Sequence, residues 1–327
     1  MARIWGIVGA GAVGGYFGFR LAQSGQQVRY LVRGQTAEAL RSNGLRVTTG
    51  GRDYSQPVEV GETPEILTGC ETVLITVKNH DLAAALEAVR QAPGLSGFSI
   101  TLQNGVGAPH EAIRVLGEDR VVGGIAYLGA ERTAPGVIVH TGLGRLMVGE
   151  MSTLPGTRCA EVVRDFETAG IPARVADRIK LEMWKKLAWN AAFNGPTALS
   201  RCSPAALASH PEGLALCQAL IGEVIEAARL QDVIIPPEVA DEQIGSSQGL
   251  TSLRTSMLQD LEAGRKLEVD ALYLYTLRVL RKAGKSAPAH QTVGALLTAA
   301  ESWIRDSRSH GSREASRPSQ PGTAGNR

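Results

Sequence analysis

Three glycines near the start of the chain restrict its fold more than any other feature. Gly9, Gly11 and Gly14 match the pattern G-x-G-x-x-G. The pattern follows the apolar segment 4–8, "IWGIV", and opens the amphipathic segment 12–24. A strand, a glycine turn and a helix in this order are typical of a dinucleotide-binding βαβ unit. The sequence therefore predicts a Rossmann-type domain at this end of the chain.

Each glycine of the turn has a predicted task. Gly9 makes the tight turn, Gly11 lets the backbone approach a pyrophosphate, and Gly14 permits close packing of the helix. The helix N-terminus adds free N–H groups and the positive end of the helix dipole. We expect the cofactor to contact the whole turn: Gly9, Ala10, Gly11, Ala12, Val13 and Gly14. A glycine-rich turn without a ligand is the alternative.

The charges of this opening segment are one-sided. No aspartate or glutamate precedes Glu38, whereas Arg3, Arg20, Arg29 and Arg33 do. In NAD-specific domains the second strand ends with an acid that binds the ribose hydroxyls. Here the second strand ends "YLVRG", and the guanidinium of Arg33 suits a 2′-phosphate. The sequence predicts NADP(H) as the cofactor, and a solvated surface arginine is the alternative.

The remaining pattern predicts an α/β domain followed by a helical one. Buried strands are expected at 73–77 and 99–102, and antiparallel strands extending the same sheet are expected between 121 and 149. From about Asp177 onward, apolar residues recur every three or four positions, which indicates helices. The expected divisions are an NADP-binding Rossmann-type domain at 1–175, an all-helical substrate and catalytic domain at 176–304, and a disordered tail at 305–327.

Composition excludes several classes of function. The net charge is +2, and the basic excess is concentrated in the arginine-bearing tail, so the body is near neutral. Nothing therefore indicates nucleic acid or an anionic membrane as a partner. The apolar runs are too short to span a bilayer. The four cysteines, with no metal-ligand spacing, indicate a reduced cytoplasmic protein without a metal site.

Two polar residues follow predicted strands. Lys78 comes just after "VLITV", and Asn104 comes just after "SITLQ". Open α/β sheets bind ligands at the carboxyl ends of their strands. We therefore expect both residues at the ligand, although either could be an ordinary loop residue.

A polar stripe crosses an otherwise apolar helix in the second half. Lys186, Asn190 and Asn194 stand at i, i+4 and i+8, which places them along one helix face. Lys185 lies on a different line. Asparagine is a poor helix former, so two of them here favour the wall of a ligand site. A solvated face is the alternative.

A second polar segment reads "TSMLQDLEAGRKLEVD". Gly264 interrupts its helical pattern, so Ser256 is expected to end one segment and Glu268 to lie in the first turn of the next. Glu268 could simply interact favourably with the helix dipole. This segment alone therefore does not indicate a ligand site.

With these motifs the chain resembles the ketopantoate reductase family, the NADPH-dependent 2-dehydropantoate 2-reductases, over about residues 3 to 300. The resemblance rests on "GAGAVGG", "VK", "QNG", "WKKLAWNAAFN" and "SMLQD…KLEVD". It implies reduction of 2-dehydropantoate to (R)-pantoate in pantothenate biosynthesis, with a small 2-oxo acid as the partner. It also implies the roles: Lys186 as catalytic lysine and general acid, Asn190, Asn194, Ser256 and Glu268 at the substrate, Arg33 and Lys78 at the adenosine phosphate, and Asn104 by nicotinamide and substrate.

The chain departs from the family pattern in two places. Asn194 is followed by Gly195 before the proline, and Lys266 and Leu267 replace a pair that is often more polar. These changes leave open another 2-oxo or 2-hydroxy acid as substrate. A non-catalytic NADPH-binding sensor is the alternative from a different class. A homodimer is compatible with the sequence.

Overall fold

The computed structural model describes residues 2–95, 97–152 and 157–315, with side chains up to 305. It divides into two compact units, Met1–Leu187 with Gln231–Ile235, and Ala188–Leu230 with Pro236–Arg327. Each unit is described below by itself.

The first unit contains a ten-stranded sheet among the described residues, in the order β4-β3-β9-β8-β7-β6-β1-β2-β5, with β10 beside β9. Its strands are β1 (Ile4–Val8), β2 (Gln27–Leu31), β3 (Leu45–Thr49), β4 (Arg52–Gln56), β5 (Glu59–Gly61), β6 (Thr72–Ile75), β7 (Phe98–Thr101), β8 (Val121–Ala134), β9 (Val137–Glu150) and β10 (Ala173–Val175). Neighbouring strands from β5 to β8 are parallel, which confirms the Rossmann-type prediction.

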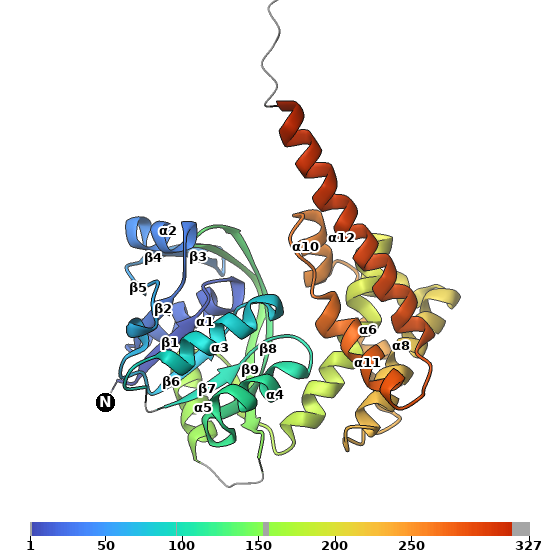
Figure 1. The fold of residues 1–327 in the computed structure, drawn as a ribbon, viewed down its shortest axis with the longest axis horizontal. Coiled ribbons are helices and arrows are strands. Elements are labelled where there is room, and N and C mark those ends of the chain that lie inside the picture. The colour runs from blue at the N-terminus through green and yellow to red at the C-terminus, as the bar shows by residue number, and fades with distance from the viewer. Residues whose placement is uncertain (1, 96, 153–156, 316–327) are drawn as a thin grey trace, which may run out of the picture. The chain divides into compact units, whose positions relative to one another are not determined.

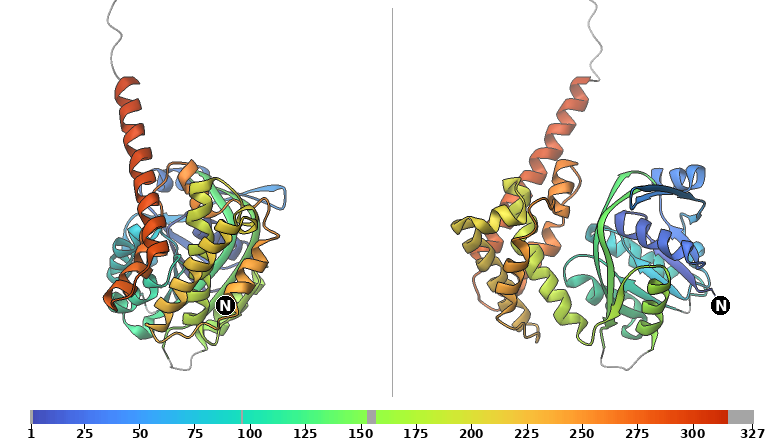
Figure 2. Two further views of the ribbon diagram at one scale, coloured as in Figure 1. Left: turned by 90° about the vertical axis from the view of Figure 1, so that its right-hand side faces the viewer. Right: turned by 180° about the vertical axis from the view of Figure 1, so that it is seen from behind.

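The long strands β8 and β9 form the antiparallel extension that the glycine-rich pattern predicts, and Figure 2 shows them curving side by side. Their two-residue connection is Pro135–Gly136, and Gly136 has a φ of 71°. A side chain is strained in this left-handed conformation, so glycine suits the turn.

Five helices accompany the sheet: α1 (Ala12–Gln23), α2 (Gln35–Asn43), α3 (Leu82–Gln91), α4 (Gly107–Leu116) and α5 (Arg158–Thr168). The crossovers β1-α1-β2 and β6-α3-β7 run in opposite directions along the sheet, so right-handed connections place α1 and α3 on opposite faces. Aromatic rings join α1 and α5 to the sheet: Phe166 lies edge-on to Trp5 at 5.6 Å and to Phe17 at 5.2 Å. Because β1, β2, β6 and β7 are parallel, their carboxyl ends lie at the same edge of the sheet.

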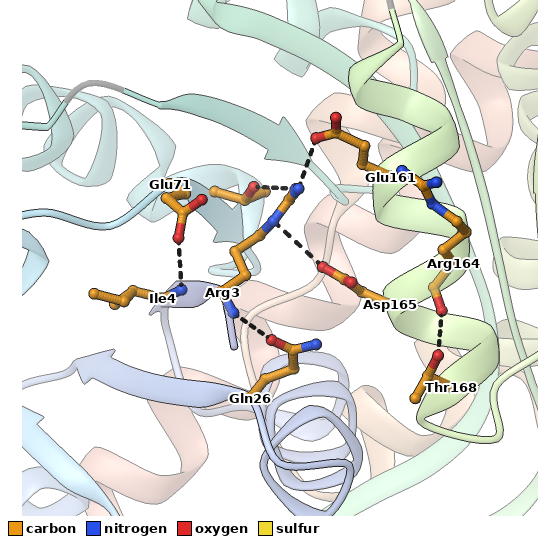
Figure 3. A network of polar contacts seen from close by, with 9 residues as sticks. Arg3, Ile4, Gln26, Glu71, Glu161, Arg164, Asp165 and Thr168 are labelled. Carbon is orange, nitrogen blue, oxygen red and sulfur yellow. Dashed lines mark hydrogen bonds and ion pairs between the residues drawn. The ribbon is translucent and has the colours of Figure 1, made fainter. Parts of the chain in front are cut away.

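The start of β1 is fixed to α5 by a polar network (Figure 3). The guanidinium of Arg3 pairs with Glu161 at 2.6 Å and with Asp165 at 3.4 Å, and it also donates to Thr72. The backbone N–H of Arg3 donates to Gln26. Arg3 therefore has a structural task at the amino end of the strand.

The second unit is helical. Its elements are the later part of α6 (Ile179–Ser200), α7 (Pro204–Ser209), α8 (Pro211–Arg229), α9 (Val239–Ser247), α10 (Ser256–Glu262), a π-type turn (Asp270–Leu274), α11 (Tyr275–Lys282) and α12 (Pro288–Ala315). Helices α8, α11 and α12 pack against one another (Figure 1). None of the described helices combines the length and the apolar character needed to cross a membrane.

The C-terminal helix is longer than the sequence predicts. The disordered tail is expected from residue 305, but α12 continues to Ala315. Extending an existing helix adds one backbone hydrogen bond for each residue fixed, so a helix anchored earlier can run on into a polar segment. The rest of the expected tail, 316–327, lies outside the described residues.

Candidate active site

The glycine turn has the geometry that a dinucleotide requires. Gly9 has a φ of 97° and donates its N–H to Leu31. A Cβ at Gly14 would lie 2.1 Å from the carbonyl oxygen of Gly9, so only glycine allows this approach of helix to strand. A Cβ at Gly11 would meet nothing within 4 Å, which leaves space beside its backbone. Of the rest of the turn, Ala10 precedes Gly11, the residue that caps α1, and Ala12 and Val13 begin the helix.

The hydroxyl of Thr76 fixes this turn from the neighbouring strand. It donates to the carbonyl of Gly9 at 2.6 Å, and it is also 3.1 Å from the carbonyl of Val8. Sequence reasoning missed Thr76, because the pairing of β1 with β6 joins positions far apart in the chain.

The segments that carry Lys78 and Asn104 lie at the ends of adjacent parallel strands, as predicted. The side chain of Gln103, which is buried, donates to the carbonyls of Ile75 and Val77 at 2.9 and 3.0 Å. The amide of Asn79 donates to the carbonyl of Asn104 at 3.0 Å. Gln103 and Asn79 therefore hold the two strand ends together. Gln103 stands in the "QNG" motif, so its signal was present in the sequence.

The four arginines of the opening segment differ in their surroundings. Arg20 donates to the carbonyl of Ala169, and Arg29 pairs with Glu59 at 3.1 Å. Arg3 belongs to the network with α5. Arg33 is exposed just past the end of β2. Of the four, Arg33 therefore stands where a nucleotide phosphate could reach it.

An acid that the local sequence does not reveal lies beside Arg33. Glu62 follows β5, and its carboxylate accepts the backbone N–H of Gly34 at 3.2 Å. Its other oxygen accepts from Arg41 at 2.8 Å. The first 37 residues therefore contain no acidic side chain, but the fold brings the carboxylate of Glu62 next to them.

Lys186, on α6, lies against β8. Its ammonium donates to the carbonyl of Ala126 at 2.8 Å and lies 5.5 Å from the ring centroid of Tyr127. A carbonyl oxygen and an aromatic face both favour a positive charge. Lys185 instead lies 3.6 Å from the carboxylate of Glu182, one turn earlier. The adjacent lysines therefore have different environments.

The ring of Tyr127 also borders a depression of about 350 Å³ in the first unit. The guanidinium of Arg145 lies 4.6 Å from its centroid. Burial raises the pKa of Tyr127 above its usual value, and the nearby carboxylate of Glu182 adds to this effect. The phenol therefore remains neutral near Lys186 at physiological pH.

The predicted polar stripe lies on one continuous helix, α6. Asn190 and Asn194 are buried, with 5% and 2% of their surface exposed. The Nδ2 atom of Asn190 has no hydrogen-bond partner among the described residues. A buried amide without a partner costs free energy, so this group is suited to a ligand. The solvated face considered from the sequence is thereby wrong.

The segment with Ser256 and Glu268 differs from the prediction. Ser256 begins α10 instead of ending a helix, because the hydroxyl of Thr255 caps the new helix by accepting the N–H of Leu258. Gly264 does end this segment, with a φ of 59°. Glu268 directly precedes the next helical turn, and its carbonyl accepts the N–H of Leu272. Its side chain is buried, whereas Ser256 is exposed.

Comparison with known proteins decides the family. The model described as "Ketopantoate reductase PanE/ApbA" matches residues 5–153, and its C-terminal counterpart matches residues 178–301. The chain belongs to the ketopantoate reductase family. It is therefore a dinucleotide-binding oxidoreductase.

Individual relatives agree with this family. A 2-dehydropantoate 2-reductase of Mesorhizobium japonicum is 32% identical over 312 residues, or 89% of this chain and 95% of that protein. A ketopantoate reductase from Ralstonia eutropha JMP134 superposes with a TM-score of 0.84 at 29% identity, covering 93% and 100% of the two chains. A D-mandelate dehydrogenase bound to NADH and anilino(oxo)acetate has the same TM-score and coverage at 20% identity, a likeness of fold alone.

Proposed function

We propose that this chain reduces 2-dehydropantoate to (R)-pantoate with NADPH, a step of pantothenate biosynthesis. The observation that carries the proposal is the stripe on α6. Lys186 is held by the carbonyl of Ala126, and the next two positions on its line are buried asparagines. One of them, Asn190, has an amide nitrogen without a partner in the described part of the chain. In a ketopantoate reductase family member, this arrangement supports recognition of a polar 2-oxo acid.

The residues of the first unit fit an NADP-type dinucleotide. The open space at Gly11 suits a pyrophosphate, and the first turn of α1 offers backbone N–H groups. We place Arg33 and Lys78 at the adenosine phosphate and Asn104 at the nicotinamide. When bound, the reduced nicotinamide supplies the hydride that the carbonyl carbon of the substrate accepts.

Lys186 acts as the general acid. Its ammonium gives one proton to the keto oxygen, where negative charge develops as the carbon–oxygen double bond becomes single. The carbonyl of Ala126 and the ring of Tyr127 favour the charged form before transfer. The amine then regains a proton from water, so the lysine ends the cycle unchanged.

The substrate is held by residues of both polar segments. Asn190, Asn194 and Ser256 bind the carboxylate and the keto group, and Asn104 contacts the nicotinamide and the substrate. The buried carboxylate of Glu268 accepts the distal hydroxyl of the substrate. A site built for a hydroxyl discriminates strongly against an analogue that lacks one.

The test is the loss of NADPH absorbance on addition of 2-dehydropantoate, with 3,3-dimethyl-2-oxobutanoate, which lacks the hydroxyl, as the comparison substrate. We expect turnover of the first at a much higher kcat/KM, and Glu268→Ala should remove most of this difference. Gly195, which stands between Asn194 and the proline, favours a second candidate, reduction of another 2-oxo acid. Turnover of other 2-oxo acids but not 2-dehydropantoate would establish it, and binding of NADPH without any turnover would indicate a sensor.

A further inference from the structure

The acid beside the predicted phosphate site is positioned by the sheet. Strands β2 and β5 are parallel neighbours, with Leu31 opposite Gly61. The N–H of Val32 continues this pairing by donating to Gly61. The residues that follow the two strands, Arg33 and Glu62, are therefore brought to the same edge of the sheet (β2 and β5 in Figure 1).

The carboxylate of Glu62 is bound there as an anion. Its two oxygens accept from the N–H of Gly34 and from the guanidinium of Arg41. The hydrogen bond from Arg41, followed by the bond from Gly34, lowers the pKa of Glu62 below its usual value. The positive charge of Arg33 contributes in the same direction. Glu62 is therefore ionised at neutral pH and already interacts with the cations around the end of β2.

A second glutamate provides a contrast. Glu38 is exposed in the first turn of α2, the helix that also carries Arg41. Its side chain makes no hydrogen bond or ion pair with any described residue. Two carboxylates therefore lie near the end of β2, and of these Glu62 contacts Gly34 and Arg41.

We propose that Glu62 is a specificity-determining residue of the cofactor site, an exposed carboxylate that limits the preference for NADP(H) over NAD(H). This inference rests on the proposed placement of the adenosine phosphate at Arg33. A 2′-phosphate would compete with Glu62 for the same cations, and the two negative groups would repel each other. A ribose 2′-hydroxyl, in contrast, can donate a hydrogen bond to a carboxylate. Glu62 therefore weakens the binding of the phosphorylated cofactor and favours the unphosphorylated one.

The experiment compares Glu62→Gln with Glu38→Gln in the full chain. Calorimetric titration with 2′,5′-ADP and with 5′-AMP measures the ribose end alone, without any reaction. The glutamine side chain keeps an oxygen that can accept a hydrogen bond from the N–H of Gly34. The backbone around Gly34 should therefore stay in place. For Glu62→Gln we expect 2′,5′-ADP to bind about three- to fivefold more tightly, the size of an exposed charge interaction. Binding of 5′-AMP should be unchanged or weaker, and Glu38→Gln should leave the ratio of the two affinities unchanged.

An unchanged or smaller ratio in Glu62→Gln would overturn the inference. The same increase in Glu38→Gln would also overturn the inference, because removing any nearby negative charge would then have the same effect. Arg33→Ala separates this inference from the proposed function. If Arg33→Ala leaves 2′,5′-ADP binding intact, the proposed phosphate placement is wrong. If Arg33→Ala weakens it and Glu62→Gln has no effect, the role of Glu62 alone is wrong.

Discussion

The hydroxyl of Tyr273 accepts a hydrogen bond from the backbone N–H of Gly195 at 2.7 Å. The same hydroxyl donates to the carbonyl of Ala191 at 2.8 Å. It therefore stands between the two backbone groups that a regular α-helix would join directly. An inserted side chain of this kind is one of the known causes of a local opening in a helix. Tyr273 thus binds the backbone of α6 at Gly195, the residue that departs from the family pattern.

The neighbouring proline affects a different carbonyl of the same helix. Pro196 lies inside α6 and has no N–H, so the carbonyl of Ala192 loses its usual donor. The thiol of Cys217 lies 3.5 Å from that carbonyl. A Cβ at Gly195 would lie 2.4 Å from the hydroxyl of Tyr273, so glycine is required there. Gly195 and Pro196 are thus compatible with a helix that still presents Asn190 and Asn194.

Removing this hydroxyl should destabilise the protein. In Tyr273→Phe, the buried N–H of Gly195 and carbonyl of Ala191 lose their hydrogen bonds to the hydroxyl. A buried polar group without a partner costs about 1–3 kcal/mol, so we expect the free energy of unfolding to fall by about 2 kcal/mol. Urea unfolding followed by circular dichroism measures it. An unchanged midpoint would mean that the helix closes its own hydrogen bond.

The two adjacent lysines should behave differently. Lys186→Ala removes the ammonium at Ala126 and should lower kcat by about a hundredfold or more, the size of a lost general acid. NADPH binding, followed by fluorescence titration, should change little. Lys185→Ala is the matched control: it removes a partly exposed pair with Glu182, so most activity should remain. A reversed outcome would reject the assigned helix face and the asparagine roles with it.

Replacing Asn190 by an apolar residue should leave stability intact but lower activity. Asn190→Leu replaces a buried nitrogen without a partner in the described residues by an apolar group of similar size. We expect the Tm of the free protein to stay equal or rise, because an unsatisfied polar group is removed. The kcat/KM for the 2-oxo acid should fall by about a hundredfold, the size of two lost hydrogen bonds.

Thr197→Val, on the same helix, provides the contrasting case. Its hydroxyl donates to Phe193 and lies 2.9 Å from the hydroxyl of Thr255, so its loss should lower the Tm. If Asn190→Leu lowers the Tm as much as Thr197→Val does, Asn190 has a structural task and its proposed role at the substrate is unsupported.

A partly buried acid, Glu223, should make stability depend on pH. Glu223 accepts from the ring of His290 at 2.6 Å and from the N–H groups of Ala289 and His290 at the start of α12. Burial alone would raise the pKa of Glu223, but these hydrogen bonds outweigh it and lower the pKa below its usual value. The stabilisation is therefore present above the unfolded-state pKa and is lost as the pH falls through the folded-state pKa.

Glu223→Gln should lower the free energy of unfolding by about 1–3 kcal/mol near neutral pH, the size of weakened hydrogen bonds to a charged group. The difference in Tm from the parent protein should shrink as the pH falls below the usual glutamate pKa of about 4.3 and the parent carboxyl takes up its proton. Thermal melts of both proteins across this range measure the effect. A difference that stays constant with pH would assign the loss to packing instead of charge.

The sequence alone was enough for features that depend on neighbouring residues. An apolar strand followed by Gly9, Gly11 and Gly14 predicts the dinucleotide turn, because left-handed backbone and close approach are local steric requirements. The helical period likewise puts Lys186 in line with two asparagines, since a helix repeats every 3.6 residues. The start of α10 was missed, although its capping residue Thr255 is visible in the sequence.

Only the tertiary structure decided which distant groups meet. Glu62 lies 28 positions from Gly34, and Tyr273 lies 78 positions from Gly195, yet each pair shares a hydrogen bond. Arg3 likewise pairs with acidic side chains on α5, so its charge is used within the fold. Strand order and the burial of apolar faces set these contacts, and they depend on the whole chain at once. A local pattern can therefore show what a segment is, while its charged and polar neighbours are fixed by the fold.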